Sequence, residues 1–474
     1  MVVGDVTTGT DVLVVGAGPG GYVAAIRAAQ LDLDVTLVEK DAYGGTCLNY
    51  GCIPSKALIS ATDVAHSAGE AEHMGIYADP AVDLDGMTDW KDTVVTRLTR
   101  GVEGLCKRAG VNLVEGRAEF ADDNTARIVH QGEGEGAESV DFEHAVIATG
   151  SRPIEIPDVP FDTEGVLTSR DVFELASLPE SLVVVGAGYI GMELSTVFAK
   201  LGTDVTVVEM LDGVLPGYED DVAEVVHDRA TELSIDFEFG LAAAGVHQRP
   251  EGGLRLRTED ETGEETEFDA EKVLVAVGRE PVTDTLGLEA VGLEPDEDGF
   301  LDTDHQCRTD REHVFAVGDV AGEPMLAHTA SAEGKVAAET IAGEPAAMDN
   351  QAIPAVVFTD PEIGTVGMTA TEAEEAGFDP VVGQVPLRSN GRALTLDERE
   401  GFVRVVADAD SEFLLGAQLV APEASEVLAE LGLAVEMGAT LEDIAGTIHT
   451  HPTLSESVME ATESAIGQAI HAPE

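Results

Sequence analysis

A pattern of strand, glycine-rich turn, helix and strand occurs twice in this chain, at residues 12–40 and again at residues 182–210. The second copy follows the first at a constant offset of 170 residues, and the last strand of each copy ends near a glutamate. Such units build an open parallel sheet, and their glycines allow a tight turn, the approach of a pyrophosphate and close helix packing. The repeat therefore predicts an α/β fold with two Rossmann-like dinucleotide-binding domains.

Each copy supplies the residue types that hold a dinucleotide. The unpaired N–H groups and the positive dipole end of the helix face the phosphates, and the glutamate can accept hydrogen bonds from a ribose diol. A single G-x-G-x-x-G is weak evidence, but chance does not easily preserve both the fingerprint and the acid. The predicted binding residues are Gly16, Gly18, Gly21 and Glu39 in the first copy and Gly186, Gly188, Gly191 and Glu209 in the second.

Each fingerprint is followed by a later apolar strand that ends in glycine, at residues 144–150 and 273–278. The polar, turn-rich sequence before each of these strands predicts an antiparallel insertion. A third apolar run, 313–322, carries Asp319, which either meets a cofactor hydroxyl or serves as a turn or helix-cap residue. Residues 343–354 are typical of a linker, and the tail beyond them predicts a separate α+β domain.

Two cysteines, Cys47 and Cys52, lie five residues apart in the segment GGTCLNYGCIPSK, residues 44–56. Such a pair can interconvert between disulfide and dithiol without moving the fold, and beside an electron carrier it becomes a redox relay. A structural disulfide and half of a zinc site are the alternatives. A chain of 474 residues can bury enough apolar surface to fold without a structural disulfide. Cys106 and Cys307 do not form a second pair with the spacing of zinc ligands, so redox chemistry is favoured and no metal is expected.

The tail contains the segment HTHPTLSE, which places His449, His451, Pro452 and Glu456 close together. Proline suits the first turn of a helix, so we expect His451 at the N-terminal edge of a helix and Glu456 about one turn further on. A histidine oriented by a carboxylate can act as a general base near neutral pH. A surface or capping histidine is the alternative.

The chain holds 91 acidic and 26 basic residues, which gives a net charge of −65. Such a surface repels nucleic acid and anionic lipid, which argues against both as partners. Molar salt shortens the Debye length from about 10 Å to roughly 3 Å, so the surplus of acid predicts a halophilic protein in a high-salt cytoplasm. The absence of an apolar run of 18 residues, and of a signal-type N-terminus, predicts no membrane partner.

The chain resembles the pyridine nucleotide–disulfide oxidoreductases from about residue 10 to residue 465. The motifs that carry the resemblance are GAGPGG, GGTCLNYGCIPSK, GAGYIGMELS, VFAVGDVAG and HPTLSE. The resemblance implies an FAD-binding domain, an NAD-binding domain inserted into it, and a C-terminal α+β interface domain that builds a homodimer. The implied boundaries are residues 1–150 and 279–350 for FAD, 151–278 for NAD and 351–474 for dimerisation.

The resemblance also assigns further cofactor contacts. Besides the first fingerprint, it implies that FAD is bound by Thr46, Lys56, Ala118, Thr149, Gly150, Asp319 and Ala327. In the NAD site it implies Gly278 near the nicotinamide half, Ala243 near the adenine and Glu193, which would pair with Lys56 beside the flavin. Glu209 favours NAD, because a carboxylate repels the 2′-phosphate of NADP.

The implied activity is the NAD⁺-dependent oxidation of dihydrolipoamide, free or on a lipoyl domain of an acyltransferase subunit, in a 2-oxoacid dehydrogenase-type complex. Cys47 would exchange with the substrate and Cys52 would face the flavin. His451 of the partner subunit, held by Glu456, would deprotonate the dihydrolipoamide.

Two other functions stay open at this point. The chain could reduce another small disulfide with NAD(P)H, or it could act mainly as a subunit that docks onto an acyltransferase core. A C-terminal cysteine pair, found in mercury-reducing relatives, is missing here, because no cysteine follows Cys307. Tyr50 in the disulfide loop and Tyr189 in the second fingerprint are small departures from the family pattern.

Overall fold

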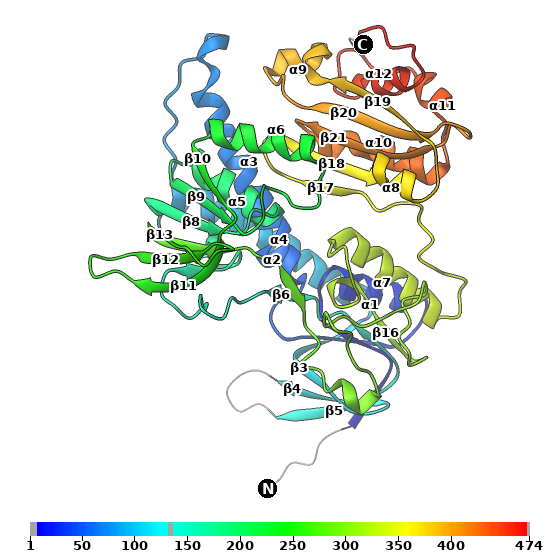
Figure 1. Cartoon of the computed structure of the whole chain (residues 1–474). Helices are drawn as coiled ribbons and strands as arrows, with labels where there is room; N and C mark the ends of the chain where they lie inside the picture. Colours follow the sequence, from blue (N-terminus) through cyan, green and yellow to red (C-terminus); the bar gives the residue numbers. More distant parts are fainter. Residues whose placement is uncertain (1–6, 131–135, 472–474) are drawn as a thin grey trace. The chain divides into compact units, whose positions relative to one another are not determined.

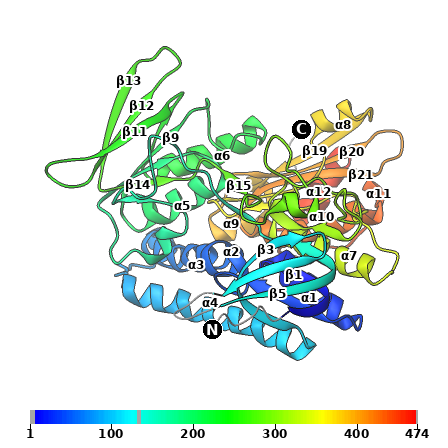
Figure 2. The same ribbon diagram turned by 90° about the horizontal axis from the view of Figure 1, so that it is seen from below.

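The computed structural model describes residues 7–130 and 136–471, and these form two compact units (Figures 1 and 2). The first unit comprises the chain up to Ile156 together with Leu167–Leu178 and Val277–Asp349. The second comprises Pro157–Val166, Pro179–Ala276 and the chain from Asn350 onward. Within the described ranges, no helix combines the length and the apolar run that a membrane span requires.

A six-stranded sheet of order β1-β2-β3-β4-β5-β16 forms the first unit, with β1 also paired to β5. Its strands are β1 (Thr7–Val15), β2 (Val35–Glu39), β3 (Asn112–Asp122), β4 (Thr125–His130), β5 (Ala137–Ile147) and β16 (Val314–Ala316). β1 runs parallel to both β2 and β5. The long strands β3 and β5 extend beyond this parallel part and pair antiparallel with β4, which confirms the first predicted insertion.

Helices cover one face of this sheet. They are α1 (Pro19–Gln30), α4 (Leu84–Ala109) and α7 (Ala327–Ile341), and α2 (Gly45–Tyr50) and α3 (Cys52–Gly69) pack against α4. Because strand side chains alternate between faces, Val12 and Val14 pack with residues of α1, α4 and α7, while Leu13 packs on the other face with the short helix η3 (Leu288–Val291). α1 and α7 touch so closely that a Cβ at Gly334 would lie 2.4 Å from the Gly20 carbonyl oxygen (Figure 1).

Short elements complete the first unit. They are the antiparallel pair β6 (Ser151–Pro153) and β15 (Arg279–Pro281), and the 3-10 turns η1 (Ala71–Met74), η2 (Asp171–Glu174) and η4 (Gly318–Val320). The pair β6 and β15 joins segments that lie more than a hundred residues apart in the chain.

The second unit begins with a five-stranded sheet of order β10-β9-β8-β14-β7. Its elements are β7 (Val166–Leu167), β8 (Ser181–Val185), α5 (Tyr189–Lys200), β9 (Asp204–Glu209), α6 (Asp220–Glu232), β10 (Ile235–Phe239) and β14 (Lys272–Val275). An antiparallel sheet is inserted before β14, as predicted, from β11 (Ala242–Gln248), β12 (Leu254–Glu259) and β13 (Glu265–Ala270). Figure 2 shows this sheet projecting beyond β14 and α5.

The internal repeat predicted from the sequence is confirmed. α1 and α5 are each 12 residues long and begin 170 residues apart, at Pro19 and Tyr189. β2 ends at Glu39 and β9 ends at Glu209. The same local sequence pattern thus produces the same strand–helix–strand unit twice.

The C-terminal part of the second unit is an antiparallel sheet of order β17-β18-β21-β20-β19. Its elements are β17 (Ala355–Val357), β18 (Glu362–Gly367), α8 (Ala370–Glu375), β19 (Pro380–Pro386), η5 (Leu387–Ser389), α9 (Gly391–Leu396), β20 (Phe402–Asp408), β21 (Leu414–Ala421), α10 (Ala424–Met437), α11 (Leu441–Ala445) and α12 (Glu456–Ala465). Residues of α10, α11 and α12 share one core with the sheet. The predicted α+β domain is therefore confirmed, and no helix or strand interrupts the predicted linker, residues 343–354.

Candidate functional site

The first glycine turn, between β1 and α1, leaves no room for side chains at two of its positions. Gly16 has φ +100°, and a Cβ there would lie 2.3 Å from the Ala148 carbonyl oxygen. A Cβ at Gly21 would lie 1.9 Å from the Gly16 carbonyl oxygen. Gly18 is the N-cap residue of α1, and the nearest atom that its Cβ would meet is the Cα of Gly45, at 4.0 Å. This open cradle at a helix N-terminus fits the pyrophosphate of a dinucleotide.

The second turn, between β8 and α5, has the same geometry. Gly186 has φ +103°, and a Cβ at Gly191 would lie 2.0 Å from the Gly186 carbonyl oxygen. Around Gly188, the N-cap residue of α5, no atom lies within 4 Å of the Cβ position. The second unit therefore offers its own phosphate cradle.

Glu39 and Glu209, at the ends of β2 and β9, accept equivalent hydrogen bonds from the backbone of their glycine turns. Glu39 accepts hydrogen bonds from the backbone N–H of Ala17 (2.6 Å) and of Asp41 (2.8 Å). Glu209 accepts from the N–H of Ala187 (2.7 Å) and of Leu211 (2.9 Å). Each carboxylate oxygen keeps a further lone pair that a ribose hydroxyl can use. Burial raises the pKa of Glu39 above its ordinary value, although the backbone N–H donors work against this rise.

Four of the longer helices that the structure describes have no aspartate or glutamate in the first turn, although the chain contains 91 of these residues. Among the described helices of ten or more residues, α4, α6, α10 and α12 carry acidic residues in the first turn. None occurs in the first turn of α1, α3, α5 or α7. A carboxylate at a helix start would neutralise the positive dipole end. These four starts are therefore left available to an anion or an electron-rich group.

Cys47 lies in α2, and Cys52 is the first residue of α3. Both are free thiols, and their side chains are hydrogen bonded to each other. This hydrogen bond, together with burial, raises the pKa of Cys47, while the nearby Lys56 works in the opposite direction. A thiolate is stabilised at a helix N-terminus, so the negative charge that the pair can carry belongs on Cys52.

The disulfide loop is held by a contact that the sequence did not indicate. The guanidinium of Arg170 lies 3.5 Å from the ring centroid of Tyr50, one of the four residues between the two cysteines. Asp41 joins the two, accepting from the Tyr50 hydroxyl (3.2 Å) and from Arg170 Nη1 (3.1 Å). Tyr50, a departure from the family pattern, thus has a partner 120 residues away in the chain.

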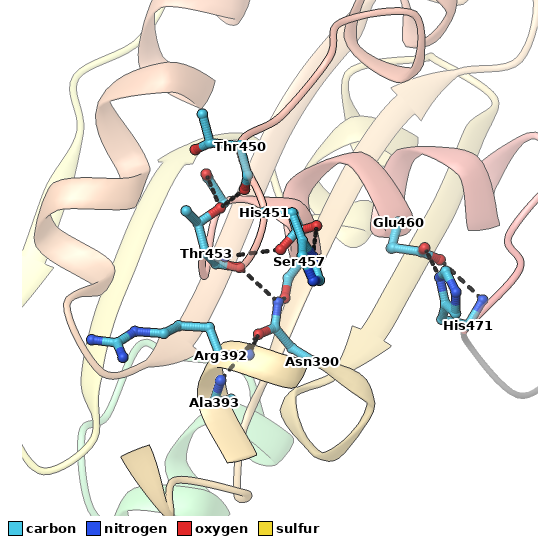
Figure 3. Close-up of polar contacts among 11 residues, drawn as sticks. Asn390, Arg392, Ala393, Thr450, His451, Thr453, Ser457, Glu460 and His471 are labelled. Atoms are coloured by element: carbon cyan, nitrogen blue, oxygen red, sulfur yellow. Dashed lines mark hydrogen bonds and ion pairs between the residues drawn. The ribbon is translucent and has the colours of Figure 1, made fainter. Parts of the chain in front are cut away.

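His451 lies in the loop before α12 (Figure 3), and it forms a dyad with Glu456, the first residue of that helix. Nδ1 of His451 lies 2.9 Å from Glu456 Oε1, so Nδ1–H donates and Nε2 is the basic nitrogen. The His451 side chain is 79% exposed. Burial works to raise the pKa of Glu456, but the hydrogen bonds from the Thr453 N–H and from His451 outweigh it and lower this pKa. Glu456 therefore stays ionised opposite the imidazole.

The predicted place of Pro452 in a helix is wrong. α12 begins at Glu456, with Ser455 as its N-cap residue, so Pro452 lies outside the helix. The reason is a turn over Thr453, whose N–H donates to Glu456 Oε2 at 2.8 Å. His451 consequently lies on a loop rather than at a helix edge, and its position depends on what holds this loop.

Several of the predicted FAD residues converge at the carboxyl end of β1. The turn at Gly16 touches Ala148 and Thr149, and Gly45, just before Thr46 in α2, lies against Gly18. Lys56, four residues into α3, is close enough to Cys47 to affect its ionisation. Ala327 is the first residue of α7.

The other predicted FAD residues have partners within the protein. Thr149 Oγ1 donates to the Val282 carbonyl (2.7 Å), and Gly150 follows with φ +69°. Asp319, in η4, accepts from Ser151 Oγ at 2.5 Å. Ala118 in β3 is buried in the core of the sheet, so only its backbone could meet a cofactor.

Predicted NAD residues occupy different surroundings in the structure. Glu193 is buried on α5, and its Oε1 accepts from the Phe358 N–H (2.9 Å); its pairing with Lys56 stays a prediction. Gly278 has φ +130°, and its Cβ position lies 3.3 Å from Ile154. Ala243 lies in β11, the first strand of the inserted sheet.

Comparison with known families decides the class of the protein. The model for "Pyridine nucleotide-disulphide oxidoreductase" matches residues 10–334, and the model for the dimerisation domain of that family matches residues 353–462. The chain belongs to this family. Its members that are dihydrolipoyl dehydrogenases use FAD and NAD.

Relatives within this oxidoreductase family match the chain over nearly its whole length. "Dihydrolipoyl dehydrogenase 2" of Haloarcula marismortui is 72% identical over 99% of this chain and 100% of its own. "Dihydrolipoyl dehydrogenase" of Halobacterium salinarum is 68% identical over 99% of both chains. The crystal structure of LpdA from Mycobacterium tuberculosis has a TM-score of 0.88 and 29% identity, covering 96% of this chain and 99% of that one. The prediction of a halophilic type is confirmed by the haloarchaeal relatives.

Two residues that hold the His451 loop of this oxidoreductase were not predicted from the sequence. Asn390, before α9, donates to the Thr453 carbonyl (3.0 Å). The sequence shows His449 only as a neighbour of His451, whereas in the structure its Nε2 lies 2.8 Å from Glu430 Oε1 on α10. Neither contact has a local sequence signal, because its partners are far apart in the chain.

Proposed function

We propose that this protein catalyses the NAD⁺-dependent oxidation of dihydrolipoamide to lipoamide, as a homodimer. The observation that carries the proposal is the Cys47–Cys52 thiol pair at the start of α3, in the unit that also contains the first phosphate cradle. The haloarchaeal relatives named dihydrolipoyl dehydrogenase support the choice of substrate. A place in a 2-oxoacid dehydrogenase-type complex follows as part of the same proposal.

The two cradles divide the cofactors between them. Gly16, Gly18, Gly21 and Glu39, with the acid-free starts of α1, α3 and α7, would hold FAD, and residues 1–150 and 279–350 are its domain. Gly186, Gly188, Gly191 and Glu209 at α5 would hold NAD, with residues 151–278 as its domain. When bound there, FAD would supply a two-electron carrier between the Cys47–Cys52 dithiol and the NAD⁺ held at the second cradle.

The thiol chemistry takes place on the two cysteines. A substrate thiolate attacks Cys47 of the Cys47–Cys52 disulfide, forms a mixed disulfide with it and releases Cys52 as a thiolate. The second substrate sulfur then attacks the substrate sulfur of the mixed disulfide, which closes the lipoamide ring and frees Cys47. The N-terminus of α3 stabilises the Cys52 thiolate, and Cys47 donates a hydrogen bond to it. The substrate loses two electrons and the cysteine pair gains them.

His451 of the partner subunit is proposed to take the proton of the first substrate thiol at its Nε2. The exposed imidazolium then releases this proton to water, and the same nitrogen takes the proton of the second thiol. Glu456 fixes the ring by accepting from Nδ1–H and stabilises the imidazolium that forms. Three large apolar side chains in this part of the chain are 64%, 73% and 95% exposed: Leu433 and Met437 on α10, and Ile448 three residues before His451. A second copy of the chain would cover such side chains, which supports the homodimer and residues 351–474 as the dimerisation domain.

A comparison of substrates and nucleotides tests the proposal. In molar salt we expect rapid reduction of NAD⁺ by dihydrolipoamide, with kcat/KM at least about a hundredfold lower for NADP⁺, because the 2′-phosphate would approach the buried carboxylate of Glu209. Initial rates of nucleotide reduction at 340 nm provide the measurement. Faster turnover of glutathione than of the lipoamide couple would instead favour a reductase of another small disulfide.

The protein is also expected to require salt. With a net charge of −65, its self-repulsion is screened over roughly 3 Å in molar salt but over about 30 Å at 0.01 M. We expect dialysis from molar to about 0.01 M salt to reduce the activity severalfold and to lower the Tm by roughly 10 °C. Calorimetry and initial rates on the same dialysed samples measure this, and unchanged values would contradict the proposed high-salt cytoplasm.

A further inference from the structure

Asn390 lies between η5 and α9 and is 7% exposed, and its amide makes four hydrogen bonds. Its Oδ1 accepts from the backbone N–H of Arg392 (2.8 Å) and of Ala393 (3.0 Å), which caps α9. Its Nδ2 donates to the Thr453 carbonyl (3.0 Å) and to Ser457 Oγ (2.8 Å). Only N–H groups face Oδ1, and a carbonyl faces Nδ2, so the orientation of the amide is set by its surroundings.

Asn390 holds the Thr453 carbonyl and the Ser457 hydroxyl (Figure 3), which belong to residues on either side of Glu456 in the sequence. Thr453 belongs to the turn before α12, and its N–H donates to Glu456 Oε2. Ser457 is the next residue after Glu456 and is buried in the first turn of α12. Asn390 therefore fixes the backbone on both sides of the carboxylate that orients His451.

The other end of the His451 loop is held by His449. Its side chain is 5% exposed, with Nε2 2.8 Å from Glu430 Oε1 and Nδ1 2.9 Å from the Thr447 carbonyl. On the N-terminal side of His451, His449 fixes the loop to Glu430 on α10. On the C-terminal side, Asn390 fixes it through the Thr453 carbonyl. His451 itself is mostly exposed, so these anchors, rather than packing around its ring, determine where its Nε2 lies.

We propose that Asn390 is a positioning residue for the general base: it holds the Thr453–Ser457 turn so that Glu456 presents His451 to the substrate thiol. The inference rests on the proposed function, because it assigns Asn390 a part in the proton transfer at His451. A displacement of about 1 Å in a reacting group can cost up to roughly a hundredfold in rate. Loss of the Asn390 amide should therefore affect the thiol step and leave nucleotide binding unchanged.

The first test substitution is Asn390→Ser. Serine also caps helices through its hydroxyl oxygen, so the start of α9 keeps its acceptor while the donor to Thr453 and Ser457 is removed. In molar salt we expect kcat for dihydrolipoamide oxidation to fall about ten- to a hundredfold. The KM for NAD⁺ and the rate of ferricyanide reduction by NADH, which bypasses the base, should stay within about twofold of the unmodified values.

Thr369→Ala is the matched control for weakened capping. Thr369 caps α8 in the same part of the fold, accepting from the Glu372 N–H, and it has no contact with the His451 loop in the described structure. Its kcat should stay within about twofold of the unmodified value. An equal loss of kcat in Thr369→Ala would show that weakened capping alone accounts for the effect, and this would overturn the proposal.

A double-mutant cycle with His451→Gln separates positioning from general damage. If Asn390 acts through the base, Asn390→Ser should cause no further loss of kcat once His451 is glutamine. A loss of the same size in both backgrounds, or an Asn390→Ser enzyme with unchanged kcat, would overturn the inference. If Asn390→Ser does not fold, Ser457→Ala, which removes one partner of the amide, takes its place with the same criterion. Full activity in His451→Gln itself would instead refute the proposed function.

Discussion

Replacement of Cys47 or of Cys52 by serine is expected to lower kcat for dihydrolipoamide oxidation by about a thousandfold or more. The serine hydroxyl cannot form the disulfide that accepts the electron pair, so neither variant can complete the exchange. Both side chains are small and only partly buried, so the substitution weakens their mutual hydrogen bond and disturbs little else in the fold. The measurement is NADH formation at 340 nm in molar salt, with the bound flavin and the dimer followed on the same samples by absorbance and light scattering.

Cys307→Ser provides the matched control for the cysteine variants. Cys307 is buried, and its Sγ donates to the Glu333 carbonyl, a hydrogen bond that a serine hydroxyl can keep. We expect this variant to retain activity within about twofold of the unmodified enzyme. Retained turnover in Cys47→Ser or Cys52→Ser, with flavin still bound, would show that the pair is not the redox centre.

In the His451→Gln variant, kcat should fall by a factor of roughly one hundred to ten thousand, which is the range of rate enhancement that a general base contributes. Glutamine can still donate to Glu456, so the loop can keep its form while the basic nitrogen is removed. The loss should be confined to the step that consumes dihydrolipoamide. Steady-state kinetics with dihydrolipoamide, set beside ferricyanide reduction by NADH, would measure this difference.

A second histidine–glutamate pair in the same unit serves as the control for His451→Gln. His471 Nδ1 lies 2.5 Å from Glu460 Oε1, and Figure 3 draws this second pair. His471→Gln should leave kcat within about twofold of the unmodified value, because His471 has no assigned part in proton transfer. Similar losses in both variants would mean that a histidine–glutamate pair supports the structure and that His451 is not the base.

The nucleotide-binding parts of the fold could be predicted because their signal is local. Residues 12–40 contain the strand, the glycine turn, the helix and the final acid in one continuous stretch, and the structure repeats this unit at residues 182–210. β19 has no local strand signal in the sequence, since Pro380, Gly383 and Pro386 disfavour a strand in isolation. Its edge position tolerates the prolines, and Gly383 lets α12 approach, because a Cβ there would lie 2.0 Å from the Ala461 carbonyl oxygen.

The candidate site could be predicted as a set of residue types but not as an arrangement. Cys47 and Cys52 are neighbours in sequence, so their contact followed from spacing. The place of His451 did not, because Pro452 predicts a helix start, whereas α12 begins only at Glu456. Asn390 and Thr453 are 63 residues apart, and only the folded sheet with its helices brings them together. Such long-range hydrogen bonds have no periodicity that a sequence could display.

The acid-free starts of α1, α3, α5 and α7 have a consequence for engineering salt tolerance. A relative from a low-salt organism could be adapted to high salt by adding aspartate and glutamate to its surface. The present chain indicates at which helix starts such acidic residues are tolerated. Acids occur in the first turns of α4, α6, α10 and α12, so helix starts as such tolerate them. The first turns of the other four helices should be left unaltered, because new negative charge there would weaken the positive helix ends that the proposed FAD and NAD sites and the Cys52 thiolate would use.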